Sequence, residues 1–286
     1  MSQYNPYGDG QQGRDMQGQA GFGLGSAQAG AIPQSRGGVS ALTIVLIVLG
    51  IFFLAAVVCV GLLAALLMPA VGAAREAGRQ MADSNNMKMV GLALHNYADV
   101  YRCLPPSYSI NSNEEKVWSW KVNLLPYIEN NSLYSEIDFR NMRRWDDPYN
   151  VVLQGPAPAT FRSVRADASM ARVNSNIFVI SSPEKLEANN TVFIDGEYPR
   201  FQDCVDGTSN TIVAIMLAKH GVPWASPENL TPDEAYDRIK GEERVFVALF
   251  LDGSVRRMSV DIEKDAFLAM LTRDGGEVVF PDQYEP

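Results

Sequence analysis

The sequence predicts an α+β protein in which a long N-terminal helix precedes a domain built on an antiparallel sheet. Residues 41–68 form an uncharged apolar run, and the chain stays helical in character from Pro69 to Tyr101. Alternating apolar residues on both sides of Asp252-Gly253 are typical of two antiparallel strands joined by a hairpin turn. The two patterns have different periods, so we expect helix first and sheet later in the chain.

The apolar run is long enough to cross a membrane. Its 28 residues include 18 Leu, Ile, Val or Phe, with Thr43 as the polar interruption. At about 1.5 Å per residue the run spans roughly 42 Å, more than the ~30 Å hydrocarbon core of a bilayer. The alternatives are a buried helix of a soluble protein, which seldom stays uncharged for so long, and a cleaved secretory signal, whose apolar region is usually ~7–15 residues. We assign residues 39–69 to a transmembrane helix that contacts lipid through 41–68.

Residues 1–38 precede this helix and contain ten of the 23 Gly, with Gln between them. Leu24 and Ile32 are almost the only aliphatic residues, so the segment buries too little apolar surface to offset the entropy of ordering. We expect a disordered tail. The formal net charge of −9 lies on residues 69–286, since the four charges before them cancel. Phosphate backbones repel such an acidic body, so nucleic acid is not an expected partner.

Residues 70–102 read as a helical stem that continues the membrane helix. Pro69 removes one backbone hydrogen bond, which should kink the helix rather than end it. Five apolar or aromatic side chains then recur at three- and four-residue steps: Met87, Val90, Leu94, Tyr97 and Tyr101. This spacing places them on one helix face that needs a covering partner, and residues 103–286 form the globular domain that supplies it.

Several segments of the domain have recognisable patterns. Residues 119–129 predict a short helix with Trp120, Leu124 and Leu125 inward, and residues 176–180 and 191–194 predict strands. The turn-forming cluster at 206–210 leads into a buried strand. That cluster can be a cation or phosphate loop, or a turn whose side chains satisfy local backbone amides. The second interpretation is favoured, because one carboxylate in a turn is a poor cation site.

The clearest strand prediction is the hairpin of Val245–Leu251 with Val255–Val260. Arg256 and Arg257 are adjacent within a strand, so they should point to opposite faces. Asp261 is a candidate cap for a following helix that ends at Gly275 and Gly276 and covers the sheet with Phe267, Leu268 and Leu271.

The three cysteines and two histidines offer little chemistry. Cys59 lies within the membrane run, as a packing residue. Cys103 and Cys204 can either form a disulfide that closes a loop of about 100 residues or remain two free, buried thiols. His95 lies off the centre of the helical stripe and reads as a surface or hydrogen-bonded residue. His220 lies in a loop without a partner motif.

The long helix with Pro at its apolar–amphipathic junction resembles type IV pilins and the pseudopilins of type II secretion. More narrowly, the chain resembles a large bacterial family of pilin-like proteins with a C-terminal domain of unknown function and a His-x9-Asp-Gly motif. The matching segments are LLMPAVGAAREAGR (66–79), SNNMKMVGLALHNYADVY (84–101), LPPS (104–107), SWKVNLLPYIE (119–129), RRWDDPYN (143–150), DGTSNTI (206–212), VPWASPENL (222–230), FLDGSVR (250–256) and LTRDGGEVV (271–279). The resemblance implies a pilin-like fold, with the helix packed on an antiparallel sheet and the domain exported.

The chain departs from the pilin processing pattern. Pilins are cleaved after a Gly that precedes Phe or Met, and a Glu occupies the fifth mature position. The nearest candidate here is Gly38 before Val39, with Thr43 at the fifth position. That Glu is thought to neutralise the amino terminus of a neighbouring subunit, which would otherwise stay unpaired inside the membrane. Cleavage near Gly38 and filament assembly therefore stay open against a plain anchor.

The chain also departs from the family at two further positions. Counting back from Asp252-Gly253, the family's His is Glu242 here, and the acid usual at the end of the strand after DGTSNT is replaced by Met216 and Leu217. If those groups form a metal or ligand site in the family, this member has lost it.

The resemblance implies a single-pass protein of the cell membrane with a cytoplasmic N-terminus and an extracytoplasmic domain. Charge bias alone does not set this orientation, because two basic residues precede the span and three follow it, namely Arg14 and Arg36, then Arg75, Arg79 and Lys88. We expect a structural or assembly protein with self-association or pilin-like partners. The alternative is an anchored recognition module that presents an acidic domain to a ligand or partner protein. An enzyme is not expected, since GxSxG, HExxH, Walker-type and CxxC patterns are all missing, and neither catalytic, cofactor-binding nor metal-binding residues are assigned.

Overall fold

The computed structural model describes residues 38–185 and 189–276. The predicted disordered tail, residues 1–38, lies outside the described residues apart from Gly38. The chain divides into two units between Leu62 and Leu63, and each is described by itself. The described architecture is α+β, with one long helix and antiparallel sheets, as the sequence predicts.

The long helix α1 comprises Ala41–Tyr101, 61 residues with Pro69 inside it. The predicted helix through this proline is therefore confirmed. Ser40 precedes the first turn and its Oγ accepts a hydrogen bond from the N–H of Thr43 at 3.2 Å. Among the described residues, α1 is the one helix long and apolar enough to cross a membrane, and its apolar window has no buried residue. This is compatible with a single-pass anchor.

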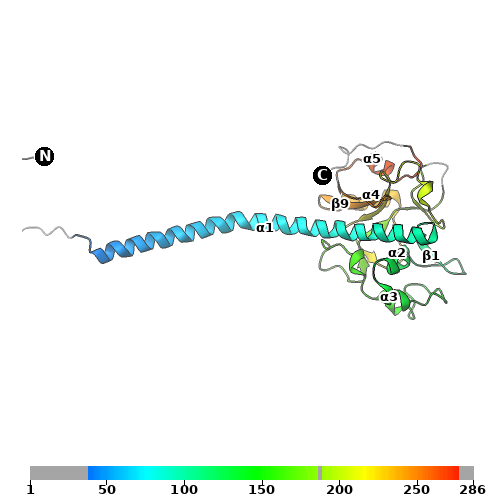
Figure 1. The fold of residues 1–286 in the computed structure, drawn as a ribbon, viewed down its shortest axis with the longest axis horizontal. Helices are drawn as coiled ribbons and strands as arrows, with labels where there is room; N and C mark the ends of the chain where they lie inside the picture. The colour runs from blue at the N-terminus through cyan, green and yellow to red at the C-terminus, as the bar shows by residue number, and fades with distance from the viewer. Residues whose placement is uncertain (1–37, 186–188, 277–286) are drawn as a thin grey trace, which may run out of the picture. The chain divides into compact units, whose positions relative to one another are not determined.

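In the second unit, α1 buries one face against the domain (Figure 1). Met87, Val90 and Leu94 are buried and belong to the core, which confirms the predicted stripe. Tyr97 packs on the same core while remaining partly exposed. Tyr101 was predicted to join them, but this is wrong, since its side chain is 55% exposed. The helix ends at Tyr101, and the ring of Tyr101 contacts the ring of Tyr97 instead, at a centroid distance of 4.4 Å.

The main sheet has four antiparallel strands in the order β10-β9-β7-β4. They are β4 (Ile177–Val179), β7 (Ile212–Met216), β9 (Val245–Phe250) and β10 (Val255–Ser259). Along β9, Val247 and Leu249 belong to the core shared with α1, whereas Ala248 and Phe250 belong to a second core. This alternation is the period-two pattern of a strand buried on both faces.

Two short helices, α4 (Pro232–Lys240) and α5 (Lys264–Ala269), supply the second core. Phe267 and Leu271 are buried there and Leu268 packs against them, so the predicted covering of the sheet is confirmed. The predicted boundaries of α5 are wrong. Its N-cap is Glu263 rather than Asp261, and it ends at Ala269, before Gly275 and Gly276.

On the opposite face, α1 approaches the sheet closely at Gly91. A Cβ added to Gly91 would lie 2.9 Å from Cδ1 of Leu249 and 3.4 Å from Cα of Gly253. Gly253 has φ of +84° in the β9–β10 turn, where Ser254 donates its N–H to Oδ1 of Asp252 at 2.8 Å. The predicted hairpin is confirmed, and its turn touches the helix.

The two arginines of β10 diverge as predicted. Arg256 lies over the ring of Phe250, with its guanidinium carbon 4.2 Å from the centroid, on the face of the second core. Arg257 donates from Nη1 to Oε1 of Gln80 on α1 at 2.7 Å. Their partners therefore lie on opposite faces of the sheet.

The remaining elements are short. The helical ones are α2 (Trp120–Leu124), η1 (Leu125–Tyr127), α3 (Asn131–Ser135), η2 (Val151–Gln154), η3 (Ala159–Phe161) and η4 (Phe201–Asp203). The paired strands are β1 (Tyr108–Ile110) with β2 (Lys116–Ser119), β3 (Asn174–Ser175) with β8 (Val222–Pro223), and β5 (Ser181–Ser182) with β6 (Phe193–Ile194) in parallel. The helix predicted at 119–129 is confirmed as α2 and η1, and the strands at 176–180 and 191–194 as β4 and β6.

Candidate functional site

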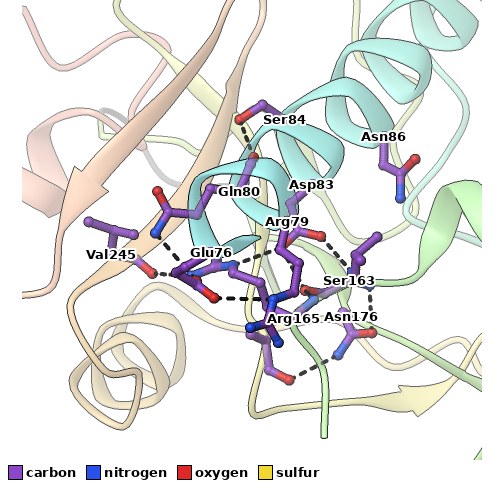
Figure 2. Close-up of polar contacts among 12 residues, drawn as sticks. Glu76, Arg79, Gln80, Asp83, Ser84, Asn86, Ser163, Arg165, Asn176 and Val245 are labelled. Carbon is purple, nitrogen blue, oxygen red and sulfur yellow. Dashed lines mark hydrogen bonds and ion pairs between the residues drawn. The ribbon is translucent and has the colours of Figure 1, made fainter. Parts of the chain in front are cut away.

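A buried carboxylate on α1 organises the most extensive polar contact between this helix and the domain. Asp83 lies one turn before Met87 and is fully buried. Its Oδ2 accepts hydrogen bonds from Nε of Arg165 at 2.8 Å and from Oγ of Ser163 at 2.7 Å. Its Oδ1 accepts the backbone N–H of Val164 at 2.6 Å. Figure 2 shows Arg165 reaching toward α1 from its loop.

A second polar side chain, Asn176, holds the loop that carries these donors. Its Oδ1 accepts the N–H of Ser163 at 2.9 Å, and its Nδ2 donates to the carbonyls of His220 at 2.8 Å and Leu217 at 3.1 Å. Asn176 immediately precedes β4, while Leu217 follows β7. One buried amide therefore joins the 163–165 loop to the ends of two strands, and that loop holds Asp83.

The Asp83–Arg165 pair is nearly removed from water, with side chains 0% and 11% exposed. A buried ion pair does not by itself raise stability, because desolvation of both charges offsets their attraction. It does specify register, since sliding α1 along the sheet would leave a buried guanidinium without its carboxylate. The arrangement therefore suits the positioning of a helix.

Glu242, Met216 and Leu217, which the sequence analysis singled out, lie near the same end of β7. The buried carboxylate of Glu242 accepts the backbone N–H of Lys219 through Oε1 at 2.8 Å. Lys219 lies just beyond β7, at whose end Met216 and Leu217 are both buried. Met216 packs in the core shared with α1 and Leu217 in the second core, so both fill apolar space.

The turn at 206–210 makes contacts that differ from those predicted. Asp206 accepts the backbone N–H groups of Gly275 at 2.7 Å and Gly276 at 2.9 Å, about seventy residues away, rather than local amides. The carbonyls of Thr208 and Ser209 accept hydrogen bonds from the region of the β9–β10 turn. Within the described ranges, no group of three or more His, Cys, Asp or Glu side chains could hold a metal ion.

The histidines and cysteines are dispersed. His95 stacks on Phe201 at a centroid distance of 4.8 Å, in a structural position. Nε2 of His220 is buried beside Gly241 without a hydrogen-bond partner in the described structure. Cys103 and Cys204 are half-buried free thiols, which selects one of the two readings left open by the sequence. Burial raises the pKa of Cys103, and this keeps it protonated at neutral pH.

Sequence reasoning missed Lys121, which lies fully buried in α2 with its Nζ 5.1 Å from the ring centroid of Trp120. Burial lowers the pKa of Lys121 to about 7, although the charge of Glu228 acts in the opposite direction. Within the described residues its Nζ has no hydrogen-bond partner. The available signal was a lysine directly after Trp120 and three residues before Leu124, both of which were predicted to face inward.

Comparison with known proteins gives one match. A family model described as "Protein of unknown function (DUF1559)" matches residues 72–218, just over half of the chain. The matched region contains the docked segment of α1, Asp83, Arg165 and the central strand β7. Neither a curated protein nor a solved structure matches the chain.

Proposed function

Because the chain belongs to the DUF1559 family of proteins of unknown function, we propose that it is a single-pass membrane protein with a pilin-like structural or assembly role outside the cytoplasm. The observation that carries the proposal is the composition of α1. The same helix contains an uncharged, exposed apolar segment and a segment whose side chains form the core of a folded domain.

The apolar segment has the energetics of an anchor. Its Leu, Ile, Val and Phe side chains are each more than half exposed in the structure. Each such residue near the bilayer centre favours insertion by roughly 0.3 to 0.6 kcal/mol, so a run of 18 favours it by several kcal/mol. Exposure of the same surface to water carries a comparable cost, which makes lipid its natural environment.

The docked segment supports a structural role rather than a catalytic one. Met87, Val90 and Leu94 pack on the sheet, and the buried Asp83–Arg165 pair fixes their register. In the proposal, the domain of residues 103–286 lies outside the cytoplasm and the stem of residues 70–102 attaches it to the membrane span of residues 39–69. This helix-on-sheet arrangement supports a pilin-like packing.

In-cell chemical cross-linking of the full chain, followed by affinity purification and mass spectrometry, tests the role. A structural or assembly protein should yield cross-links between copies of itself or to other single-pass proteins with an N-terminal apolar helix. If only monomer is recovered, the assembly role is wrong. The intact mass of the purified chain shows whether the N-terminal segment is cleaved. A mass that corresponds to a start at Val39 indicates pilin-type cleavage, and a start at Met1 or Ser2 indicates a plain anchor.

A second candidate function, an anchored recognition module, is favoured by the buried Glu242. Its carboxylate accepts the backbone N–H of Lys219 and lines a cavity. Under this hypothesis the same cross-linking experiment returns one heterologous partner and no copy of the chain itself.

A further inference from the structure

A cavity of about 320 Å³ lies beside the Asp83–Arg165 contact. α1 contributes Glu76 and Arg79 to its wall, and the segment after α4 contributes Glu242. Its volume is at the lower end of the range for sites that bind small organic ligands. Nearly every side chain in the wall is charged, so the net charge left after internal pairing decides what the cavity can hold.

The basic side chains of the wall already have partners. Arg79 pairs with Glu76 at 3.3 Å and Lys219 with Glu243 at 3.7 Å. Arg165 donates Nε to Asp83, and its Nη2 has no surface open to a ligand. The wall therefore presents no unpaired cation, which argues against an anionic ligand.

Two carboxylates are left over. Glu242 is 7% exposed, and its Oε1 accepts the N–H of Lys219, while no described residue pairs with its Oε2. Asp167 accepts the N–H of Ser169 at 2.8 Å, and this bond lowers its pKa, so it is ionised at neutral pH. Neither forms an ion pair within the described part of the chain. Asp167 is exposed to solvent, whereas Glu242 is buried. A buried carboxylate without a cation is costly, and a cationic ligand removes that cost.

The type of cation follows from the donor set and the space. Ca²⁺ requires six to eight oxygen ligands, which two carboxylates do not supply. A planar guanidinium needs few partners, because its N–H groups can bind both oxygens of one carboxylate or bridge two. The aliphatic stems of Arg79 and Lys219 can line the chain that carries it. We propose that this cavity binds a guanidinium group, with Glu242 as the buried acceptor and Asp167 as the second carboxylate.

Isothermal titration calorimetry on the full chain in detergent micelles tests the site with butylguanidinium as the probe. Butylurea is the control ligand, with the same shape and no charge. We expect saturable one-to-one binding of butylguanidinium and none of butylurea. Equal heats from both compounds, or heats that do not saturate, would overturn the proposal.

Glu242→Gln is the decisive variant, because the amide oxygen can still accept the N–H of Lys219 while the charge is lost. It should weaken butylguanidinium binding about ten- to hundredfold, the loss expected for one charge-assisted hydrogen bond. Glu263→Gln is the matched control, since Glu263 is exposed and lies outside the cavity wall, and it should leave the affinity within about twofold. Unchanged binding in Glu242→Gln with retained thermal unfolding would contradict the site.

A guanidinium can come from a free metabolite or from an arginine side chain of a partner protein. A second titration with acetyl-Gly-Arg-Gly-amide distinguishes them. Tighter binding of the peptide than of butylguanidinium assigns the site to a partner's arginine, whereas weaker binding assigns it to a small molecule. If neither compound binds, no guanidinium site exists here.

Discussion

The carboxylate of Asp83 on α1 accepts a hydrogen bond from Nε of Arg165 at 2.8 Å, with Asp83 fully buried. These residues are 82 positions apart in the sequence, and their pair joins the helix to the loop between η3 and β3. Because both charges are shielded from water, removal of either one leaves the other uncompensated.

Asp83→Asn should therefore destabilise the domain by about 3–5 kcal/mol, the usual cost of breaking a buried pair from one side. Thermal or urea unfolding of the full chain in detergent measures this. Glu76→Gln is the matched control on the same helix, because the Glu76–Arg79 pair is largely exposed and worth about 0–1 kcal/mol. Equal effects of the two substitutions would mean that the buried pair does not fix the helix.

Close approach of α1 to the sheet predicts a sharp difference between two glycines of the same helix. Gly91→Val should destabilise by about 1–3 kcal/mol, because the added atoms overlap Leu249 and approach the backbone of Gly253. Gly78 has nothing within 4 Å of an added Cβ. Gly78→Val should therefore be neutral or slightly stabilising, since Val has the higher helix propensity. Similar unfolding midpoints for both variants would contradict the packing described.

Lys121 predicts a specific pH dependence of stability. Its folded-state pKa is about 7 because of burial, whereas the unfolded chain keeps this proton up to about pH 10.4. Between these values the unfolded state binds more protons, so the Lys121 contribution to stability rises with pH from 7 upward and is constant below. Lys121→Met, which keeps the volume and removes the charge, should be more stable than the parent chain at pH 7.

The gap between Lys121→Met and the parent should narrow by pH 9.5. Urea midpoints of both chains at pH 7 and 9.5 measure it, and comparison of the two chains cancels the other titrating groups. A gap that is independent of pH would show that Lys121 is solvated or paired in the folded protein.

The free thiols predict the oxidation state of the purified chain. Sγ of Cys204 lies 3.1 Å from Oγ1 of Thr211, and Sγ of Cys103 donates to the carbonyl of Tyr101 at 3.5 Å. Alkylation under denaturing, non-reducing conditions should therefore label all three cysteines, Cys59 included. A mass that shows one label would establish the disulfide between Cys103 and Cys204.

The sequence predicted the parts of the fold that depend on local pattern. The 61-residue α1, the β9–β10 hairpin and the buried Met87, Val90 and Leu94 all follow from periodicity and turn residues. The predicted burial of Tyr101 was wrong because the apolar spacing continues in the sequence to the end of α1, whereas the domain does not cover this last position. The prediction that Asp261 caps α5 was wrong. The N–H of Asp261 bonds to Oγ of Ser259 at 3.1 Å in a turn, and α5 begins only after Glu263.

The candidate site could not be derived in the same way, because its contacts join distant segments. Asp83 appeared as one polar residue on a helix, and nothing near it in the sequence identifies Arg165 as its partner. Asp206 was expected to accept local backbone amides, yet its carboxylate accepts the backbone N–H groups of Gly275 and Gly276. The buried position of Glu242 depends on how α4 returns to the end of β7, which only tertiary structure defines.

Protease accessibility on intact spheroplasts tests the proposed anchored, extracytoplasmic arrangement most directly. The full chain carries an epitope tag at each end, and proteinase K is added before and after lysis. We predict loss of the C-terminal tag and survival of a membrane-bound fragment with the N-terminal tag in intact cells. Full protection of the C-terminal tag until lysis, or recovery of the chain in the soluble fraction without detergent, would contradict the arrangement.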